Sequence, residues 1–253
     1  MMPRKTLPLV LVIVLCTFAT GLHASRGVRI VVVAEAILAG TPAAAALASF
    51  DARDACTDPA YALAPWHLTG PYQWYYNPAG APPEVADTAL PTIQTATQTV
   101  LAGHNRCGLP AALGTSQRYL GTTTRTAGIS PSGACTGDDG YSVTSWGRLP
   151  PSYLAYTCVY YNASTGAVLS SDLMIDNSVH HWFTTPPAAC LGAYDLQSVA
   201  THERGHTAGL AHVDQSQHGT ETMSPATRPC DTTERLLALG DLTGLKKLYA
   251  TSG

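Results

Sequence analysis

The sequence predicts an α+β fold. Segments rich in aromatic and β-branched residues and segments with helical periodicity follow one another in the order strand, helix, strands, helix, loop, helix. The 253 residues fit one domain, and no internal repeat or interdomain linker divides them. Hydrophobic residues make up 45% of the chain and charged residues only 12%, so there is enough apolar surface to form a core.

The first strand and the first helix are predicted on either side of a proline-rich loop. Tyr72–Tyr76 is aromatic and typical of a strand. After the loop Pro78–Pro83, Pro91 suits the first turn of a helix and Gly103 suits its end. The residues between them that recur on one helical face are Ile93, Ala96, Thr97, Val100 and Leu101.

Three further strands are predicted before the next helix. They span Tyr141–Trp146, Tyr153–Tyr161 and Val168–Ile175. The turn-forming segment Asn162–Gly166 separates the last two, so we expect these two strands to form a hairpin.

Two more helices complete the predicted fold. The first runs from about Leu196 to Ala208, with Asp195 as its N-cap and Gly209 at its end. The last spans roughly Asp241 to Tyr249.

The first 24 residues have the organisation of a secretory signal peptide. Two positive charges within Met1–Lys5 precede the apolar run Leu7–Ala19, and small residues follow. The apolar run is too short to span a bilayer. We therefore predict that residues 1–24 are a signal peptide and that the protein is secreted and extracellular, with no membrane partner once the signal is removed.

The domain boundaries follow from this prediction. Residues 25–55 are predicted to be a short pro-segment or linker, and residues 56–253 to be the folded domain. A second apolar stretch, Ile30–Ala48, contains Glu35 and Pro42. It leaves two interpretations open: part of a pro-segment, or the true signal peptide if translation starts near Val28.

The cysteines agree with export. Removing the signal removes Cys16 and leaves an even set of six, which predicts three disulfides: Cys56, Cys107, Cys135, Cys158, Cys190 and Cys230. We expect Cys190 to pair with Cys230, because these two residues flank the helix near residues 196–208 and the segment that follows it.

The overall charge excludes one class of function. The formal net charge is −3, and no Lys/Arg cluster lies beyond the N-terminus. Nucleic-acid binding is therefore excluded on electrostatic grounds. We expect a monomer.

The segment His202–His212 contains the candidate metal-binding and catalytic residues. It reads His-Glu-x-x-His followed by a third histidine. On a helix, His202 and His206 project from one face, close enough to share an ion. Gly209 can adopt the left-handed conformation that turns the chain back, so His212 reaches the same ion. Three imidazoles and one water make a tetrahedral Zn²⁺ site with an open position, which is typical of a catalytic zinc.

Glu203 is the predicted catalytic residue. It is adjacent to His202, so its carboxylate reaches the edge of the site without being a ligand. We expect Glu203 to take a proton from the zinc-bound water, which attacks the scissile carbonyl, and to return that proton to the leaving amine.

These residues resemble those of a known family. His-Glu-x-x-His-x-x-Gly-x-x-His is the metzincin signature. Thr222-Met223-Ser-Pro225 resembles the family's Met-turn, in which a methionine packs beneath the zinc. Met-x-Pro, and the tail from Gly240 to Tyr249, are similar to those of the matrixins, the clan of the matrix metalloproteinases and their bacterial relatives. The resemblance is strong over Leu196–Tyr249.

The resemblance implies a fold and a function. The fold would be zincin-like: a twisted mixed sheet over an active-site helix, with a small C-terminal subdomain that ends in a helix. The protein would be a secreted zinc endopeptidase acting on protein or peptide substrates, with Met223 and Pro225 supporting the zinc ligands. We expect the substrate to add a strand along Val168–Asp172. The alternatives are a non-catalytic zinc-containing binding module and a zinc hydrolase of non-peptide bonds.

Four features depart from the family pattern or leave alternatives open. Arg204 replaces an apolar residue, and Gly240 replaces the first Asp of the tail motif, which removes one carboxylate near the site. Asp138-Asp139-Gly140 is either a calcium contact or a solvated turn, and we expect the turn. His180-His181 is either a pair of ligands or an exposed loop, and we expect the loop.

Cys107 resembles the cysteine of a latency switch but is predicted to lie in a disulfide. Arg106-Cys107-Gly108 is similar to the matrixin segment whose thiolate holds the zinc of the zymogen. That segment precedes the first strand of the catalytic domain, whereas Cys107 follows the first predicted strand and helix. Its use as a ligand would also leave an odd number of cysteines.

Overall fold

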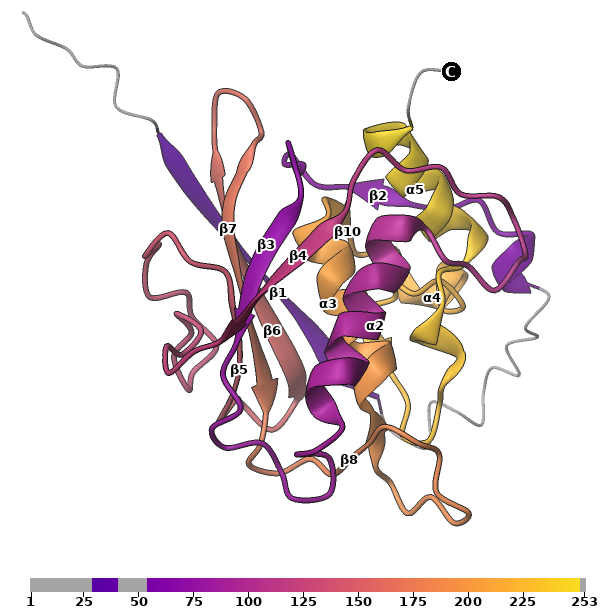
Figure 1. Cartoon of the computed structure of the whole chain (residues 1–253). Coiled ribbons are helices and arrows are strands. Elements are labelled where there is room, and N and C mark those ends of the chain that lie inside the picture. Colours follow the sequence, from indigo (N-terminus) through magenta and orange to yellow (C-terminus); the bar gives the residue numbers. More distant parts are fainter. Residues whose placement is uncertain (1–28, 41–53, 251–253) are drawn as a thin grey trace, which may run out of the picture.

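A computed structural model describes residues 29–40 and 54–250 (Figure 1). The predicted signal peptide, residues 1–24, lies outside the described residues, as do parts of the predicted pro-segment or linker.

The centre of the fold is a twisted, mixed, seven-stranded sheet. Its strands, in spatial order, are β11 (Ala226–Thr227), β1 (Ile30–Ala39), β6 (Tyr153–Asn162), β7 (Val168–Asp176), β5 (Val143–Gly147), β3 (Tyr72–Tyr76) and β4 (Gln117–Thr122). The pairs β7–β5, β5–β3 and β3–β4 are parallel, whereas β6 is antiparallel to both β7 and β1. Together with the helices, this sheet confirms the predicted α+β fold.

The helices lie mainly on one face of the sheet. They are α2 (Ala89–Ala102), α3 (Leu196–Thr207), α4 (Gln215–His218) and α5 (Leu239–Tyr249), with 3-10 turns η1 (Asp54–Cys56) and η2 (Thr233–Arg235). Figure 1 shows α2 and α3 side by side against the sheet, with α5 beyond them. Two small ladders join β2 (Ala62–Leu63) to β10 (Leu210–Ala211) and β8 (Trp182–Phe183) to β9 (Tyr194–Asp195). Trp74, Ile93, Leu173 and Val199 belong to the buried core that the helices and the sheet share.

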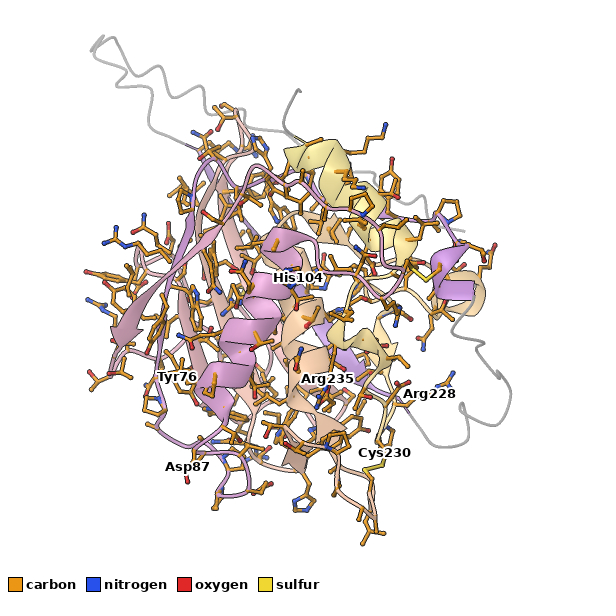
Figure 2. All side chains as sticks on the ribbon, turned by 45° about the vertical axis from the view of Figure 1, so that its right-hand side comes forward. Tyr76, Asp87, His104, Arg228, Cys230 and Arg235 are labelled. Atoms are coloured by element: carbon orange, nitrogen blue, oxygen red, sulfur yellow. A yellow bond between two sulfur atoms is a disulfide. The ribbon has the colours of Figure 1, made fainter. Side chains whose placement is uncertain are left out.

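Local sequence explains where the two central helices begin and end. The helix α2 buries its predicted apolar face and ends at Gly103, which is left-handed with φ 73°. The side chain of Asp195 caps α3 by accepting a hydrogen bond of 3.0 Å from the Ser198 N–H. Arg235 (labelled in Figure 2) donates to both carboxylate oxygens of Asp195, at 2.8 and 2.6 Å, and so ties η2 to the start of α3.

The predicted hairpin is confirmed, but several strands, among them β1 and β4, were not predicted. The strands β6 and β7 pair antiparallel, and the N–H groups of Thr165 and Gly166 donate to the Asn162 carbonyl in the turn between them. The strand β1 falls inside the segment predicted as a pro-segment or linker, where it pairs with β6 along most of its length. The strand β4 pairs with β3 at one edge of the sheet.

The expected substrate strand along Val168–Asp172 is wrong. This part of β7 lies inside the sheet, between β6 and β5. Residues Val168 to Asp172 already pair with Tyr161 to Cys158 of β6. The side of this segment that faces β6 is therefore not available to an added strand. On the other side, the N–H groups of Val168 and Ser171 already donate to the His67 carbonyl and the Ser142 hydroxyl.

Three disulfides are present, as predicted. Cys190 pairs with Cys230 (labelled in Figure 2), which confirms the expected pair; the others are Cys56–Cys107 and Cys135–Cys158. Because Cys107 is bonded to Cys56, it is not a free thiol that could hold a metal. Disulfides are compatible with an extracellular protein. Among the described residues, no helix has the length and apolar character needed to cross a membrane.

Candidate metal centre

The three predicted histidines converge on one point. His202 and His206 project from the same face of α3, and their Nε2 atoms lie 3.0 Å apart. The chain turns back at Gly209, which has a φ of 94°, and brings the Nε2 of His212 to 3.0 Å from that of His202 and 3.1 Å from that of His206. His202 and His206 are fully buried, whereas His212 is partly exposed.

The other ring nitrogens fix which atoms face inward. The Nδ1 of His202 lies 2.7 Å from the Thr222 carbonyl oxygen, and the Nδ1 of His206 lies 3.0 Å from the Leu210 carbonyl oxygen. A carbonyl only accepts hydrogen bonds, so each Nδ1 carries the proton and each Nε2 presents a lone pair. The Nδ1 of His212 faces a third acceptor, the Oε2 of Glu35, at 3.4 Å.

This donor set fits a zinc ion. Lone pairs at 3.0–3.1 Å repel one another unless a cation lies between them. Protonation is disfavoured, because burial lowers the pKa of His206 to about 3 and that of His212 to about 4. Zinc–nitrogen bonds of about 2.0–2.1 Å in a tetrahedron would separate the nitrogens by about 3.3 Å, close to the separations observed. The three histidines can therefore hold Zn²⁺ and leave one position open.

Glu203 lies buried beside the histidines. Its Oε1 accepts a hydrogen bond of 3.1 Å from the Ile37 N–H, and its Oε2 accepts one from the Thr157 hydroxyl. Burial raises the pKa of Glu203 to about 8, although the bonds from Thr157 and Ile37 act in the opposite direction. A carboxyl with a pKa near neutrality can both accept and release a proton.

The turn at Met223 packs against α3 and is held in place by hydrogen bonds to Asp241. Met223 is buried, and its sulfur lies where a side chain on Gly205 would be, so the second variable residue of the His-Glu-x-x-His motif must be small. The carboxylate of Asp241 accepts hydrogen bonds from the N–H groups of Thr222 (2.8 Å) and Met223 (3.2 Å). Asp241 thereby positions the Thr222 carbonyl that orients His202.

Steric constraint explains why position 240 is a glycine. A Cβ there would collide with the Ala60 carbonyl oxygen. The carboxylate of Glu221 lies beside Gly240, and its Oε2 accepts a hydrogen bond of 3.1 Å from the Asp241 N–H. A second carboxylate is thus present near the Met223 turn, but it comes from Glu221 rather than from position 240.

Arg204 points away from the histidines into the interface between α3, α2 and the sheet. It is buried, and it donates hydrogen bonds to the hydroxyls of Thr97, Tyr72 and Thr144. Its guanidinium carbon also lies 4.9 Å from the centroid of the Trp74 ring. Hydroxyls and aromatic rings thus take the place of a carboxylate partner.

The other candidate ligands lie elsewhere. His180 pairs with Asp176 at 2.9 Å, and His181 is exposed beside Glu84. Asp139 pairs with Arg125 at 3.1 Å, in an exposed turn next to Asp138. In residues 29–40 and 54–250, His202, His206 and His212 form the one group of three or more side chains that could hold a metal ion.

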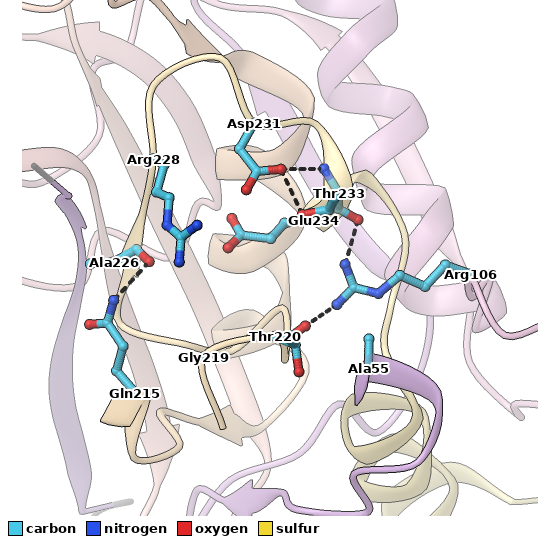
Figure 3. A pocket seen from close by; sticks show the side chains of 10 residues that line it. All are labelled: Ala55, Arg106, Gln215, Gly219, Thr220, Ala226, Arg228, Asp231, Thr233 and Glu234. Atoms are coloured by element: carbon cyan, nitrogen blue, oxygen red, sulfur yellow. Dashed lines mark hydrogen bonds between the residues drawn. The ribbon is translucent and has the colours of Figure 1, made fainter. Parts of the chain in front are cut away.

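A separate cavity of about 110 Å³ is lined by Ala226 of β11, Arg106 and Glu234, among others, and does not include the histidines (Figure 3). Arg106 spans one side of it and donates to the carbonyls of Thr233 and Thr220. This arginine therefore holds two loops together.

The sequence did not reveal three contacts of the site. Thr157 from β6, and Glu35 and Ile37 from β1, contact Glu203 or His212. None of these residues has a fixed spacing from the histidine motif. The alignment of β1 with β6, which pairs Glu35 with Thr157, is the feature that brings them there.

Comparison with known proteins agrees with the geometry. Residues 155–250 match the model of the matrixin family, from within β6 to the end of α5, and this range includes all three histidines, Glu203 and Met223. No curated protein matches the chain. The family suggests a zinc metallopeptidase, and a peptidase acts on proteins or peptides. The family match and the three-histidine cluster together fit a matrixin-like metzincin.

Proposed function

We propose that this protein is a secreted, zinc-dependent endopeptidase. The observation that carries the proposal is the position of a buried carboxylate, Glu203, beside three histidine nitrogens that share one focus, within the segment that matches the matrixins. The predicted signal peptide at residues 1–24 and the three disulfides support secretion. We propose one catalytic zinc ion per monomer.

His202, His206 and His212 are the proposed zinc ligands. When bound, zinc would polarise the scissile carbonyl and make water a stronger nucleophile. The carbonyls of Thr222 and Leu210 keep the Nε2 atoms of His202 and His206 turned toward the ion. The closely packed Met223 turn supports this arrangement from below.

Glu203 is the proposed general base and acid. It accepts a proton from the attacking water and passes that proton to the leaving amine nitrogen. The Thr157 hydroxyl donates to one carboxylate oxygen, Oε2, and the other, Oε1, accepts the Ile37 N–H. The raised pKa of Glu203, about 8, supports a role in which the carboxyl carries a proton for part of the cycle.

The experiment is a peptide-hydrolysis assay with metal control. The purified full-length protein is incubated with zinc, and a library of quenched peptides is added with and without a chelator. We expect internal peptide bonds to be cleaved, the cleavage to stop on chelation, and zinc to restore it. Full zinc occupancy with no peptide cleaved would identify a binding module instead. Cleavage of esters but not of peptides would identify a different hydrolase.

A further inference from the structure

The strand β1 lies between β6 and the short outermost strand β11, on the side of the sheet that borders the metal centre. Residues Ile30–Leu38 pair antiparallel with β6, and Leu38 and Ala39 pair parallel with Ala226 and Thr227 of β11. In Figure 1 this strand, the indigo arrow, runs diagonally along the sheet and passes behind α3. An extended peptide bound between two strands in this way is a common mode of peptide recognition.

One peptide bond of β1 lies directly at the proposed catalytic residue. The nitrogen of Ile37 is 3.1 Å from the Oε1 of Glu203 and donates a hydrogen bond to it. Two residues earlier, the Glu35 carboxylate lies 3.4 Å from the Nδ1 of His212. The chain therefore passes the metal centre at Ala36, and the Ile37 nitrogen is one end of the Ala36–Ile37 peptide bond.

The residues after this bond are held by the backbone beyond Met223. The N–H of Leu38 donates to the Pro225 carbonyl at 2.8 Å, and the N–H of Gly40 donates to the Thr227 carbonyl at 2.8 Å. The side chain of Ile37 is fully buried, whereas Ile30 and Val32 on the same strand are 48% and 44% exposed. Ile37 is thus the anchoring side chain of this segment.

We propose that Ala36–Ile37 is a self-cleavage site, and that residues 30–40 are the first substrate of this protein. This inference rests on the proposed endopeptidase function. Water adds to the carbonyl carbon of Ala36, the bond from that carbon to the Ile37 nitrogen breaks, and the products are a carboxylate at Ala36 and an amine at Ile37. Water is the only co-reactant. Glu203 already touches the nitrogen that must receive the proton.

The same placement has a consequence for other substrates. As long as β1 is paired, it occupies the backbone hydrogen-bonding groups of β6 and β11 that face it. A second peptide cannot form the same hydrogen bonds, so the intact chain is latent toward other peptides. This latency does not involve Cys107, which is bonded to Cys56.

The first measurement follows the cleavage itself. The full-length chain is loaded with zinc, sampled over time, and examined by intact mass and N-terminal sequencing. We expect a new N-terminus at Ile37, with a rate that does not depend on protein concentration, and no cut in the presence of chelator. In Ile37→Asp a carboxylate would be buried beside Glu203, and cutting at this bond should fall by about 10²-fold or more. Val32→Asp, at an exposed site of the same strand, is the matched control and should be cut normally.

The second measurement does not depend on activity. In the full-length Glu203→Gln variant, hydrogen exchange of the Ile37, Leu38 and Gly40 amides should be slowed at least about tenfold relative to an unstructured segment. Adding Ile37→Asp to this variant should remove the protection. Thermal melting and disulfide mapping would show that the rest of the fold is intact.

The outcomes separate this inference from the proposed function. If added peptides are cleaved while the Ala36–Ile37 bond stays intact and these amides exchange freely, the inference is wrong and the endopeptidase function stands. A first cut at another bond within residues 29–40 would also overturn the assignment. If the zinc-loaded Ile37→Asp variant, in which β1 should no longer block the edge of β6, also cleaves no peptide, the proposed function fails.

Discussion

The guanidinium of Arg204 donates a hydrogen bond to the hydroxyl of Tyr72 at 2.8 Å, deep between α3 and the sheet. Arg204 is adjacent to the proposed catalytic residue, yet its contacts belong to the core. The Tyr72 hydroxyl also donates to the Ser171 carbonyl, and the Thr97 hydroxyl donates to the Ile93 carbonyl. Both hydroxyls therefore keep a partner when Arg204 is replaced.

We expect this arginine to be replaceable by an apolar residue of similar length. Burying a charge without a carboxylate partner is costly, and apolar substitutes for buried ionic groups are often neutral or stabilising. Arg204→Met should therefore be more stable than Arg204→Ala by at least about 2 kcal/mol, because alanine leaves a cavity. Urea unfolding of both variants measures the difference. Equal losses in the two variants would show that the charge itself holds the interface.

The Cys56–Cys107 disulfide should contribute to stability and not to latency. It closes a loop with a sequence separation of 51 residues, which corresponds to about 4 kcal/mol in the chain-entropy estimate. The double variant Cys56→Ser/Cys107→Ser, which leaves no free thiol, should melt at a lower temperature and show no increase in peptide hydrolysis before processing. Activation of the unprocessed chain by this change would support the latency-switch interpretation.

Asp241 should affect zinc affinity through the Met223 turn. Its carboxylate accepts hydrogen bonds from Thr222 and Met223, and the Thr222 carbonyl orients His202. In Asp241→Asn an amide N–H would face a backbone N–H. We expect zinc affinity, measured by competition with a chromogenic chelator, to fall by about 10–100-fold. Asp231→Asn, where the carboxylate accepts a hydrogen bond from the Thr233 N–H before η2, is the control and should leave affinity unchanged. Equal affinities in the two variants would contradict this role.

Glu221 should make stability fall as the pH rises. Burial, together with the charge of Asp241, raises the pKa of Glu221 to about 9, against about 4.3 in an unfolded chain. The folded protein therefore binds the proton more tightly than the unfolded chain does. The stabilisation is complete below pH 4 and is lost as the pH rises toward 9, at up to about 1.4 kcal/mol per pH unit for one proton.

The Glu221→Gln variant isolates this effect. The amide resembles the protonated carboxyl in shape but does not titrate. The free energy of unfolding, measured by urea titration from pH 5 to pH 9, should decline less steeply in the variant than in the wild type. Parallel curves would show that Glu221 titrates normally.

Local sequence signals predicted the elements around the site well. The helical periodicity of residues 93–101, the N-cap at Asp195 and the turn at 162–166 all lie where the structure has them. The histidine motif also brings its three rings together, because the spacing on α3 and the turn at Gly209 are set within eleven residues. These features depend on short-range geometry.

The strand β1 could not be predicted in the same way. Its apolar composition is equally typical of a signal peptide or a pro-segment, and its strand state depends on pairing with β6, more than 100 residues away. The contact of Ile37 with Glu203 is separated by 166 residues. Likewise, Glu221 places a carboxyl group beside position 240, which itself has no room for a side chain.

The most direct test of the central claim is the Glu203→Gln variant at full zinc occupancy. The substitution keeps all three histidines and the size of the side chain, but removes the group that carries the proton. We expect zinc content and melting temperature close to the wild type and a loss of peptide hydrolysis of about 10²–10⁴-fold or more. Glu234→Gln, the same change at another buried glutamate, should remain active. Near-normal hydrolysis by zinc-loaded Glu203→Gln would contradict the account.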